Sequence, residues 1–152
     1  RERFLTVGMA KVATSAEEAF ELGILRKGID EVSVSAERRI GRAKRAVIEL
    51  YEQGYSQPVE RTDIKVLGKK GLGIFVAGAR SMESAKYISE HDRIISEEFG
   101  YVMAGDDLTQ ATEVSERYLL GLERKALLKL AMTRKSMERM QSLVTTGRPL
   151  RN

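Results

Sequence analysis

The chain of 152 residues contains no cysteine and no tryptophan, and it has only two prolines and one histidine. Without cysteine it can form no disulfide, no thiolate metal site and no cysteine nucleophile. Because His91 is the only histidine, a metal site with several histidine ligands is also excluded. No apolar run approaches the roughly 20 residues that cross a bilayer, so we expect no membrane span. The opening Arg1-Glu2-Arg3 is not followed by the apolar core of a signal peptide, which fits a cytoplasmic protein.

Aromatic residues are also scarce, at 6% of the chain, which disfavours nucleic-acid binding by base stacking. The net charge is only +4, and acidic and basic residues alternate along most of the sequence. This pattern indicates a mixed, solvated surface. The exception is a basic stripe from Arg38 to Arg45, which we interpret as the solvated face of a helix. Nucleic-acid binding by this stripe is the alternative, and a steep salt dependence would reveal it.

What the sequence has in abundance is helix signals. Capping residues, apolar residues at helical spacing and terminal glycines recur along the chain. Two short stretches, 31–34 and 64–67, could instead be extended. The sequence therefore predicts a mostly α fold, with 1–152 as a single helical region and at most one or two short strands. The predicted helices are a short one from the Thr14–Glu18 capping box to Gly23, then 35–53, 71–87, 89–105, one from Ser115 or Thr112 to about 130, and a last one that ends at Gly147.

Residues that could carry chemistry are few. His91 lies between Glu90 and Asp92, as a general base with an acidic neighbour would, but we interpret it as a first-turn or solvent-facing histidine. The pair Asp106-Asp107 could touch Mg²⁺, although a loop favours these residues in any case. The glycine-rich segment 68–73 lacks the Lys-Ser/Thr of a P-loop and the third glycine of a dinucleotide fingerprint. At most, this segment predicts a contact with a phosphate or with coenzyme A.

Three segments of the chain point to a known family. Residues 10–23 read AKVATSAEEAFELG, and residues 87–92 read YISEHD. The third segment, residues 122–152, is a pair of helical patterns that closes with Gly147-Arg148-Pro149. In these segments the chain resembles the C-terminal part of bacterial enzymes that fuse a 3-hydroxyacyl-CoA dehydrogenase to an enoyl-CoA hydratase-like (crotonase) domain. The likeness extends over most of the chain, and the absence of an initial methionine predicts that Arg1 is not a natural start.

The resemblance implies that the catalytic parts of this fatty-acid β-oxidation enzyme lie outside the present chain. A crotonase domain binds acyl-CoA and polarises the thioester carbonyl with two backbone N–H groups, and one or two glutamates then add water. In the family these parts precede the segment seen here, and the NAD-binding unit lies further upstream. The chain would therefore hold no catalytic residue, no metal and no cofactor of its own. Its implied partners are the upstream domains of the same polypeptide, acyl-CoA and other copies in a homo-oligomer.

The resemblance also names two candidate ligand residues. In simple crotonases the last helix carries an aromatic residue and then a basic residue before proline, and both can touch coenzyme A. Arg148 stands at the basic position, and Leu143 replaces the aromatic residue, which removes ring stacking on the adenine. Arg148 and Leu143 are thus the predicted coenzyme A contacts. The alternative interpretation of the whole chain is a free-standing helical module for protein interaction, one able to dimerise.

Overall fold

The computed structural model describes residues 2–152, so Arg1 lies outside the described residues. The chain divides into two compact units. Unit 1 combines the N-terminal residues up to Met9 with Glu60–Asn152, and unit 2 is Ala10–Val59. The division does not test whether 1–152 is a single helical region of a larger domain, and this interpretation stays a prediction.

Most of the described residues are helical and two short strands accompany them, which confirms the mostly α prediction. None of the described helices is both long and apolar enough to cross a membrane. Unit 1 contains α1 (Glu2–Gly8), β1 (Ile64–Val66), α4 (Gly68–Ser84), α5 (Glu90–Ala104), β2 (Thr112–Val114), α6 (Glu116–Ala131) and α7 (Arg134–Thr146), and unit 2 contains α2 (Ala16–Glu21) and α3 (Arg39–Glu52).

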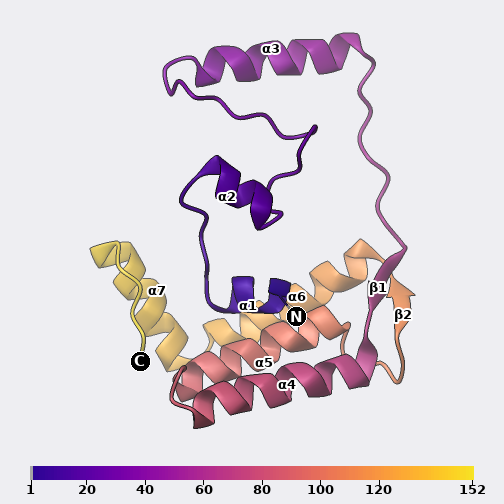
Figure 1. The fold of residues 1–152 in the computed structure, drawn as a ribbon. Helices are drawn as coiled ribbons and strands as arrows, with labels where there is room; N and C mark the ends of the chain where they lie inside the picture. The colour runs from indigo at the N-terminus through magenta and orange to yellow at the C-terminus, as the bar shows by residue number, and fades with distance from the viewer. Residues whose placement is uncertain (1) are drawn as a thin grey trace. The chain divides into compact units, whose positions relative to one another are not determined.

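In unit 1, α4 and α5 lie side by side as an antiparallel pair, and α6 packs on α5 (Figure 1). The two strands form an antiparallel ladder at one end of these helices, with Ile64 opposite Val114 and Val66 opposite Thr112. At the other end α7 leaves α6 and contacts it. The ladder thus connects the segment before α4 to the segment before α6. At the opposite end of the helices, α7 contacts the N-terminal end of α5.

A small aromatic core holds α1 to the α4–α5 pair. Phe4 stacks on Phe75 with ring centroids 4.7 Å apart and on Phe99 at 5.5 Å. Gly100 allows this close packing, because a Cβ atom there would lie 2.7 Å from the Cβ of Phe75. On α4 itself, a Cβ at Gly73 or Gly78 would meet nothing within 4 Å, so these two glycines do not create the close contact. The core and the side chains packed on it are Phe4, Leu72, Phe75, Phe99, Met103 and Ala104.

Most helix boundaries follow their capping residues. Ser89 and Asp92 form a capping box at the start of α5, and Gly105 ends it in the left-handed conformation at φ +76°. Ser115 caps α6, and Gly147 ends α7. As predicted, the Thr14–Glu18 region opens α2, with the Ser15 side chain accepting from the Glu18 amide.

Several boundaries differ from the prediction. The long helix begins at Arg39 rather than at residue 35 and has no side-chain cap, and α4 begins at Gly68 rather than at residue 71. Residues 31–34 form no strand. The expected extended piece at 64–67 is β1, and its partner β2 was not predicted as a strand because its three residues have no apolar alternation. The helix α1 was also not predicted.

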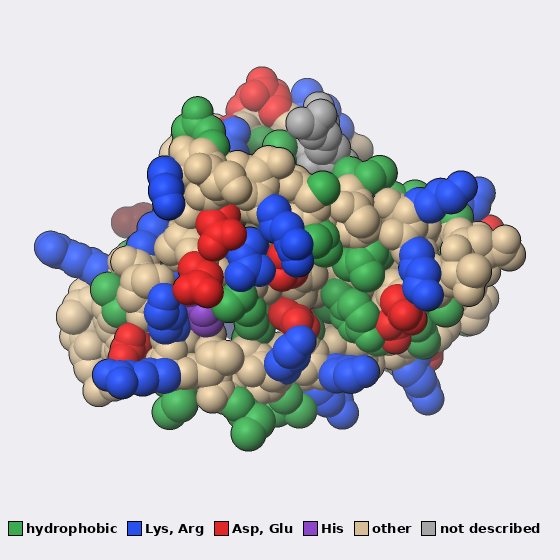
Figure 2. All heavy atoms as spheres, turned by 90° about the horizontal axis from the view of Figure 1, so that it is seen from below, with side chains coloured by type: hydrophobic (Ala, Val, Ile, Leu, Met, Phe, Trp, Pro, Cys, Tyr) green, Lys and Arg blue, Asp and Glu red, His purple; other side chains and the backbone are tan. Residues whose placement is uncertain are grey.

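The molecular surface mixes charges of both signs, as the composition predicted. Figure 2 shows Lys and Arg side chains next to Asp and Glu on the viewed face, with apolar side chains between them. Unit 2 has little interior of its own, since α3 has no buried residue. The apolar side chains of α3 that are exposed are Ile40, Val47, Ile48, Leu50 and Tyr51.

Candidate functional site

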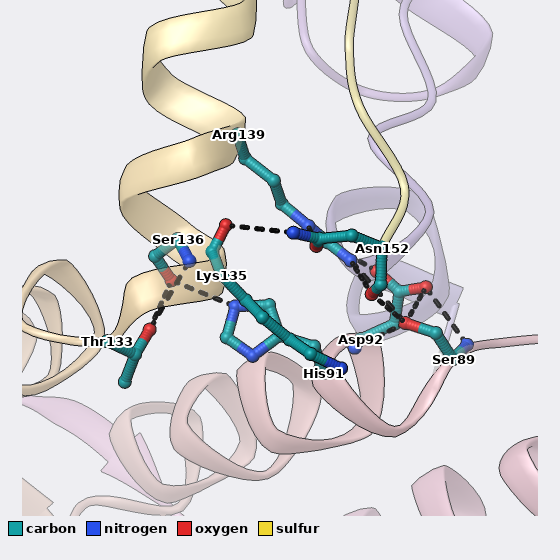
Figure 3. A network of polar contacts seen from close by, with 8 residues as sticks. All are labelled: Ser89, His91, Asp92, Thr133, Lys135, Ser136, Arg139 and Asn152. Carbon is teal, nitrogen blue, oxygen red and sulfur yellow. Dashed lines mark hydrogen bonds and ion pairs between the residues drawn. The ribbon is translucent and has the colours of Figure 1, made fainter.

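The densest polar cluster of unit 1 joins the N-terminal end of α5 to α7 (Figure 3). Arg139 of α7 donates from Nη1 to Asp92 Oδ1 at 2.6 Å, and its Nη2 lies 3.4 Å from Ser89 Oγ. The side chains of Arg139 and Asp92 are only 18% and 20% exposed. Asp92 also accepts from the Ser89 amide at 3.0 Å, so one member of the α5 capping box is also the partner of α7. Removing this carboxylate would affect both helices.

The last residue of the chain completes this cluster. Arg139 Nε donates to the Asn152 side-chain oxygen at 2.9 Å, and both Arg139 and Ser89 donate to the Asn152 backbone oxygen at 3.2 Å. The amide nitrogen of Asn152 in turn donates to Glu138 Oε2 at 2.8 Å. The segment after Gly147 therefore folds back along α7 and is held at its end (Figure 3).

His91 forms the second link between α5 and α7. Its Nε2 lies 3.0 Å from the Ser136 hydroxyl, which also lies 2.9 Å from the hydroxyl of Thr133, the cap of α7. His91 is a first-turn residue, as interpreted, but it is only 3% exposed, so the solvent-facing alternative is wrong. No local sequence pattern indicates this pair, because Ser136 follows 45 positions later on another helix.

The surroundings of the cluster lower the pKa of both His91 and Asp92, for different reasons. Burial lowers the pKa of His91, and the positive charges of Arg139 and Lys135 lower it further against the opposing effect of Asp92 and Glu90. Burial raises the pKa of Asp92, but hydrogen bonds from Arg139 and Ser89 outweigh it and leave this pKa below its ordinary value. At neutral pH the cluster therefore holds a neutral imidazole beside an ionised Asp92–Arg139 pair.

The geometry of His91 and Ser136 matches a base and a hydroxyl at hydrogen-bond distance, which is the first requirement for an activated nucleophile. A substrate could not reach this pair, because α7 covers the imidazole and the Ser136 hydroxyl is already bonded to the helix cap Thr133. What the arrangement does is dock α7 and the chain's last residues onto α5. We therefore assign it a structural role.

The other polar candidates are also occupied in structural contacts. The Lys69 amide donates to the Leu108 carbonyl at 2.7 Å, so the glycine-rich start of α4 does not present this amide to an anion. Asp107 pairs with Lys69 at 3.6 Å, and the pKa of Tyr101 rises to about 12 because its hydroxyl bonds to Asp106 next to it. Among the described residues no group of three or more acidic or histidine side chains could hold a metal ion.

Both predicted coenzyme A residues lie at the C-terminal end of α7. Leu143 is 56% exposed on the last turns of the helix. Arg148 follows the left-handed Gly147, and its backbone is fixed by the hydroxyls of Ser142 and Thr146 at 3.2 Å. The guanidinium of Arg148 is exposed and forms no ion pair with the part of the chain that the structure describes. The structure places both side chains in the open, where a ligand or another polypeptide could reach them.

The same end of unit 1 exposes a row of large apolar side chains. On α7 they recur every three or four residues, which places them on one face of the helix. Burying such side chains is favourable, so a face of this kind is typical of a contact with another chain or segment. The exposed apolar residues of α6 and α7, with the residue that follows α6, are Leu120, Leu127, Leu128, Met132, Met137, Met140, Leu143 and Val144.

Comparison with known proteins connects the chain to one enzyme. It is 42% identical over 149 residues to a protein of Bacillus subtilis (strain 168) named "Probable 3-hydroxyacyl-CoA dehydrogenase". The relative is thus named as a probable dehydrogenase. The match covers 98% of this chain and 19% of the relative, so the chain spans about a fifth of that protein's length. No family model matches the chain, and no solved structure matches it.

Proposed function

We propose that this chain is the C-terminal helical region of a crotonase-like domain, in a fatty-acid β-oxidation enzyme that fuses this enoyl-CoA-hydrating domain to a 3-hydroxyacyl-CoA dehydrogenase. The observation that carries the proposal is the 42% identity over nearly the whole chain to a protein named as such a dehydrogenase. Three segments of the sequence, at 10–23, 87–92 and 122–152, support the crotonase part by resemblance.

In this proposal the chain is not catalytic alone. NAD is the cofactor implied for a dehydrogenase, but the residues present do not fit it. The glycine-rich segment 68–73 opens a helix whose Lys69 amide is already bonded to Leu108, and a Cβ at Gly68 would lie 2.5 Å from the same carbonyl oxygen. We therefore assign NAD and the reacting part of acyl-CoA to the rest of the longer polypeptide, and a cytoplasmic location remains part of the proposal.

The role that remains for this segment is docking. The exposed apolar faces of α3, α6 and α7 would cover the upstream domains of the same polypeptide and other copies in a homo-oligomer. The Asp92–Arg139 pair and the His91–Ser136 contact would hold α7 in the position that this docking needs. In this proposal the end of α7 lies over the acyl-CoA site of the longer polypeptide and helps to close it.

Arg148 and Leu143 would then contact coenzyme A. The arginine guanidinium suits a phosphate group, because it offers several N–H donors in a planar fork. The test is Arg148→Gln in the full-length enzyme, and Arg124→Gln is the matched control because Arg124 is an exposed arginine of α6. We expect Arg148→Gln to raise the KM for acyl-CoA about three- to tenfold with kcat little changed. Equal KM values for the two variants would contradict the assignment.

A further inference from the structure

We infer that one face of α3, in unit 2, docks onto another helix, on a surface that is apolar and carries a carboxylate at its centre. The residues of this outer face are Ile40, Lys44, Val47, Ile48 and Tyr51, each three or four positions from its neighbours on the helix surface. Its four apolar side chains are 55–84% exposed. This docking rests on the proposed function, because the helix that it needs would belong to the longer polypeptide.

Residues 29–33 of unit 2 lie along the opposite side of α3. Arg42 donates to the Val32 carbonyl at 3.4 Å and pairs with Glu31 at 3.3 Å. Two hollows are formed there, and the α3 residues that line both of them are Arg42, Ala46 and Glu49. No residue of the outer face lines either of these two hollows. The outer face therefore points away from residues 29–33, and this segment leaves it uncovered.

Lys44 gives the outer face its positive charge. Its neighbours one turn away along the helix are Ile40, Gly41, Val47 and Ile48, so no carboxylate of α3 lies next to it. Lys44 also forms no ion pair with any part of the chain from residue 2 to residue 152. An ammonium group that is covered loses its hydration, and a carboxylate on the covering surface offsets this loss. The surface that fits the outer face is therefore apolar with an acidic centre.

A second copy of the chain does not meet this requirement. Lys44 lies near the middle of the outer face, which extends from Ile40 to Tyr51. In a symmetric dimer each face contacts the same face of its partner, so residues near the centre meet their own copies. Two lysines would then be brought together without a carboxylate, and such like-charge contacts are unfavourable. The charge of the outer face thus favours a different surface over self-association.

The shape of the outer face favours a helix as the occupant. Ile40, Lys44 and Ile48 form one row at a spacing of four residues, and Val47 and Tyr51 form a second such row. Rows with this spacing are the ridges that pack into the grooves of another helix. A helix that lies on a membrane keeps its lysines on the polar face. Because Lys44 stands within the apolar rows, a helix that pairs with it fits better than a lipid surface.

The experiment measures amide hydrogen exchange of residues 39–52 in the full-length enzyme and in the 152-residue chain. Because α3 has no buried residue within the chain, its amides should exchange quickly there. We expect exchange to be at least about tenfold slower in the full-length enzyme, where the outer face is covered. The ratio of the two rates measures docking. Taking this ratio for each variant separately removes any effect of a substitution on the helix itself.

Three variants test the role of Lys44. Lys44→Glu should lower the ratio about three- to tenfold, because it places a carboxylate against the carboxylate of the partner helix. Arg45→Glu is the matched control, since it makes the same change of charge at the next position, where the side chain lines one of the two hollows instead. It should change the ratio less than about twofold. Lys44→Met removes the charge but keeps an apolar stem, and it should also lower the ratio, because it leaves the partner carboxylate buried without a cation.

Four results would overturn the inference. Equal exchange in the enzyme and in the chain would show that the outer face stays uncovered. Equal losses in the two charge reversals would leave only the general field of the helix. A higher ratio in Lys44→Met would show that the partner surface is apolar throughout. Slower exchange of the isolated chain at higher concentration, or on phosphatidylglycerol vesicles, would identify a second copy or a lipid surface as the occupant.

A dehydrogenase assay on the same preparation separates this docking from the proposed function. If the enzyme oxidises 3-hydroxyacyl-CoA with NAD while α3 exchanges as fast as in the isolated chain, the docking is wrong and the proposed function stands. If the enzyme shows no such activity, the proposed function fails, and the exchange of α3 then decides the docking alone.

Discussion

Replacing Arg139 by glutamine tests whether the polar cluster fixes α7. The substitution removes the 2.6 Å bond to Asp92 and three further contacts to Ser89 and Asn152. Breaking a fully buried ion pair costs roughly 3–5 kcal/mol, and an exposed pair contributes at most about 1 kcal/mol. Because the two side chains are about four-fifths covered, we expect a loss of about 2–3 kcal/mol in the free energy of unfolding.

The assay is urea unfolding at pH 7, followed by circular dichroism. Arg134→Gln is the control, because Arg134 lies on the same helix and pairs with Glu138, yet its side chain is 92% exposed. This control is expected to cost less than about 0.5 kcal/mol. Hydrogen exchange should also show faster exchange of the α7 amides in Arg139→Gln. Equal losses in the two variants would refute the reasoning that partial burial makes this pair strong.

Three further predictions concern titration, packing and catalysis. Since the folded state lowers the pKa of His91, the unfolded chain binds a proton more readily, and the free energy of unfolding should fall as the pH drops below about 6.5. His91→Gln should flatten this slope in urea titrations between pH 7.5 and 5, and an unchanged slope would contradict the assignment. Gly73→Ala, where a Cβ meets nothing within 4 Å, should stabilise the chain by about 0.5–1 kcal/mol, while Gly100→Ala should destabilise it by about 1–3 kcal/mol because its Cβ meets Phe75 at 2.7 Å. Opposite shifts of the thermal midpoint would check this, and a gain in both would be inconsistent with tight packing of α4 on α5. The isolated chain should turn over neither 3-hydroxyacyl-CoA with NAD nor crotonyl-CoA, and measurable turnover by the pure chain would speak against a purely docking role.

Local signals predicted much of the fold. Helix ends depend on residues within one turn, so Ser89, Gly105 and Gly147 marked their boundaries correctly. The boundary of α3 was missed because Ser35 lies before a turn rather than at the helix, and Arg38 takes the capping position without a side-chain bond. The helix α1 was missed because its stability comes from Phe4 packing between Phe75 and Phe99, which no local pattern reveals.

The candidate site was predictable only in part. The coenzyme A contacts of Leu143 and Arg148 stay a prediction from the resemblance, and the structure leaves both side chains exposed. The partnership of His91 with Ser136, and of Asp92 with Arg139, joins helices more than 40 positions apart. Such pairs depend on the angle at which α7 leaves α6, and that angle is a property of tertiary packing rather than of residue spacing.

The most direct test of the central claim is to sequence the reading frame around the codon for Arg1. The account predicts an uninterrupted frame upstream that encodes most of a dehydrogenase, as expected for a chain that matches 19% of its relative. A start codon shortly before Arg1, with a stop codon in frame ahead of it, would contradict the account and favour a free-standing helical module.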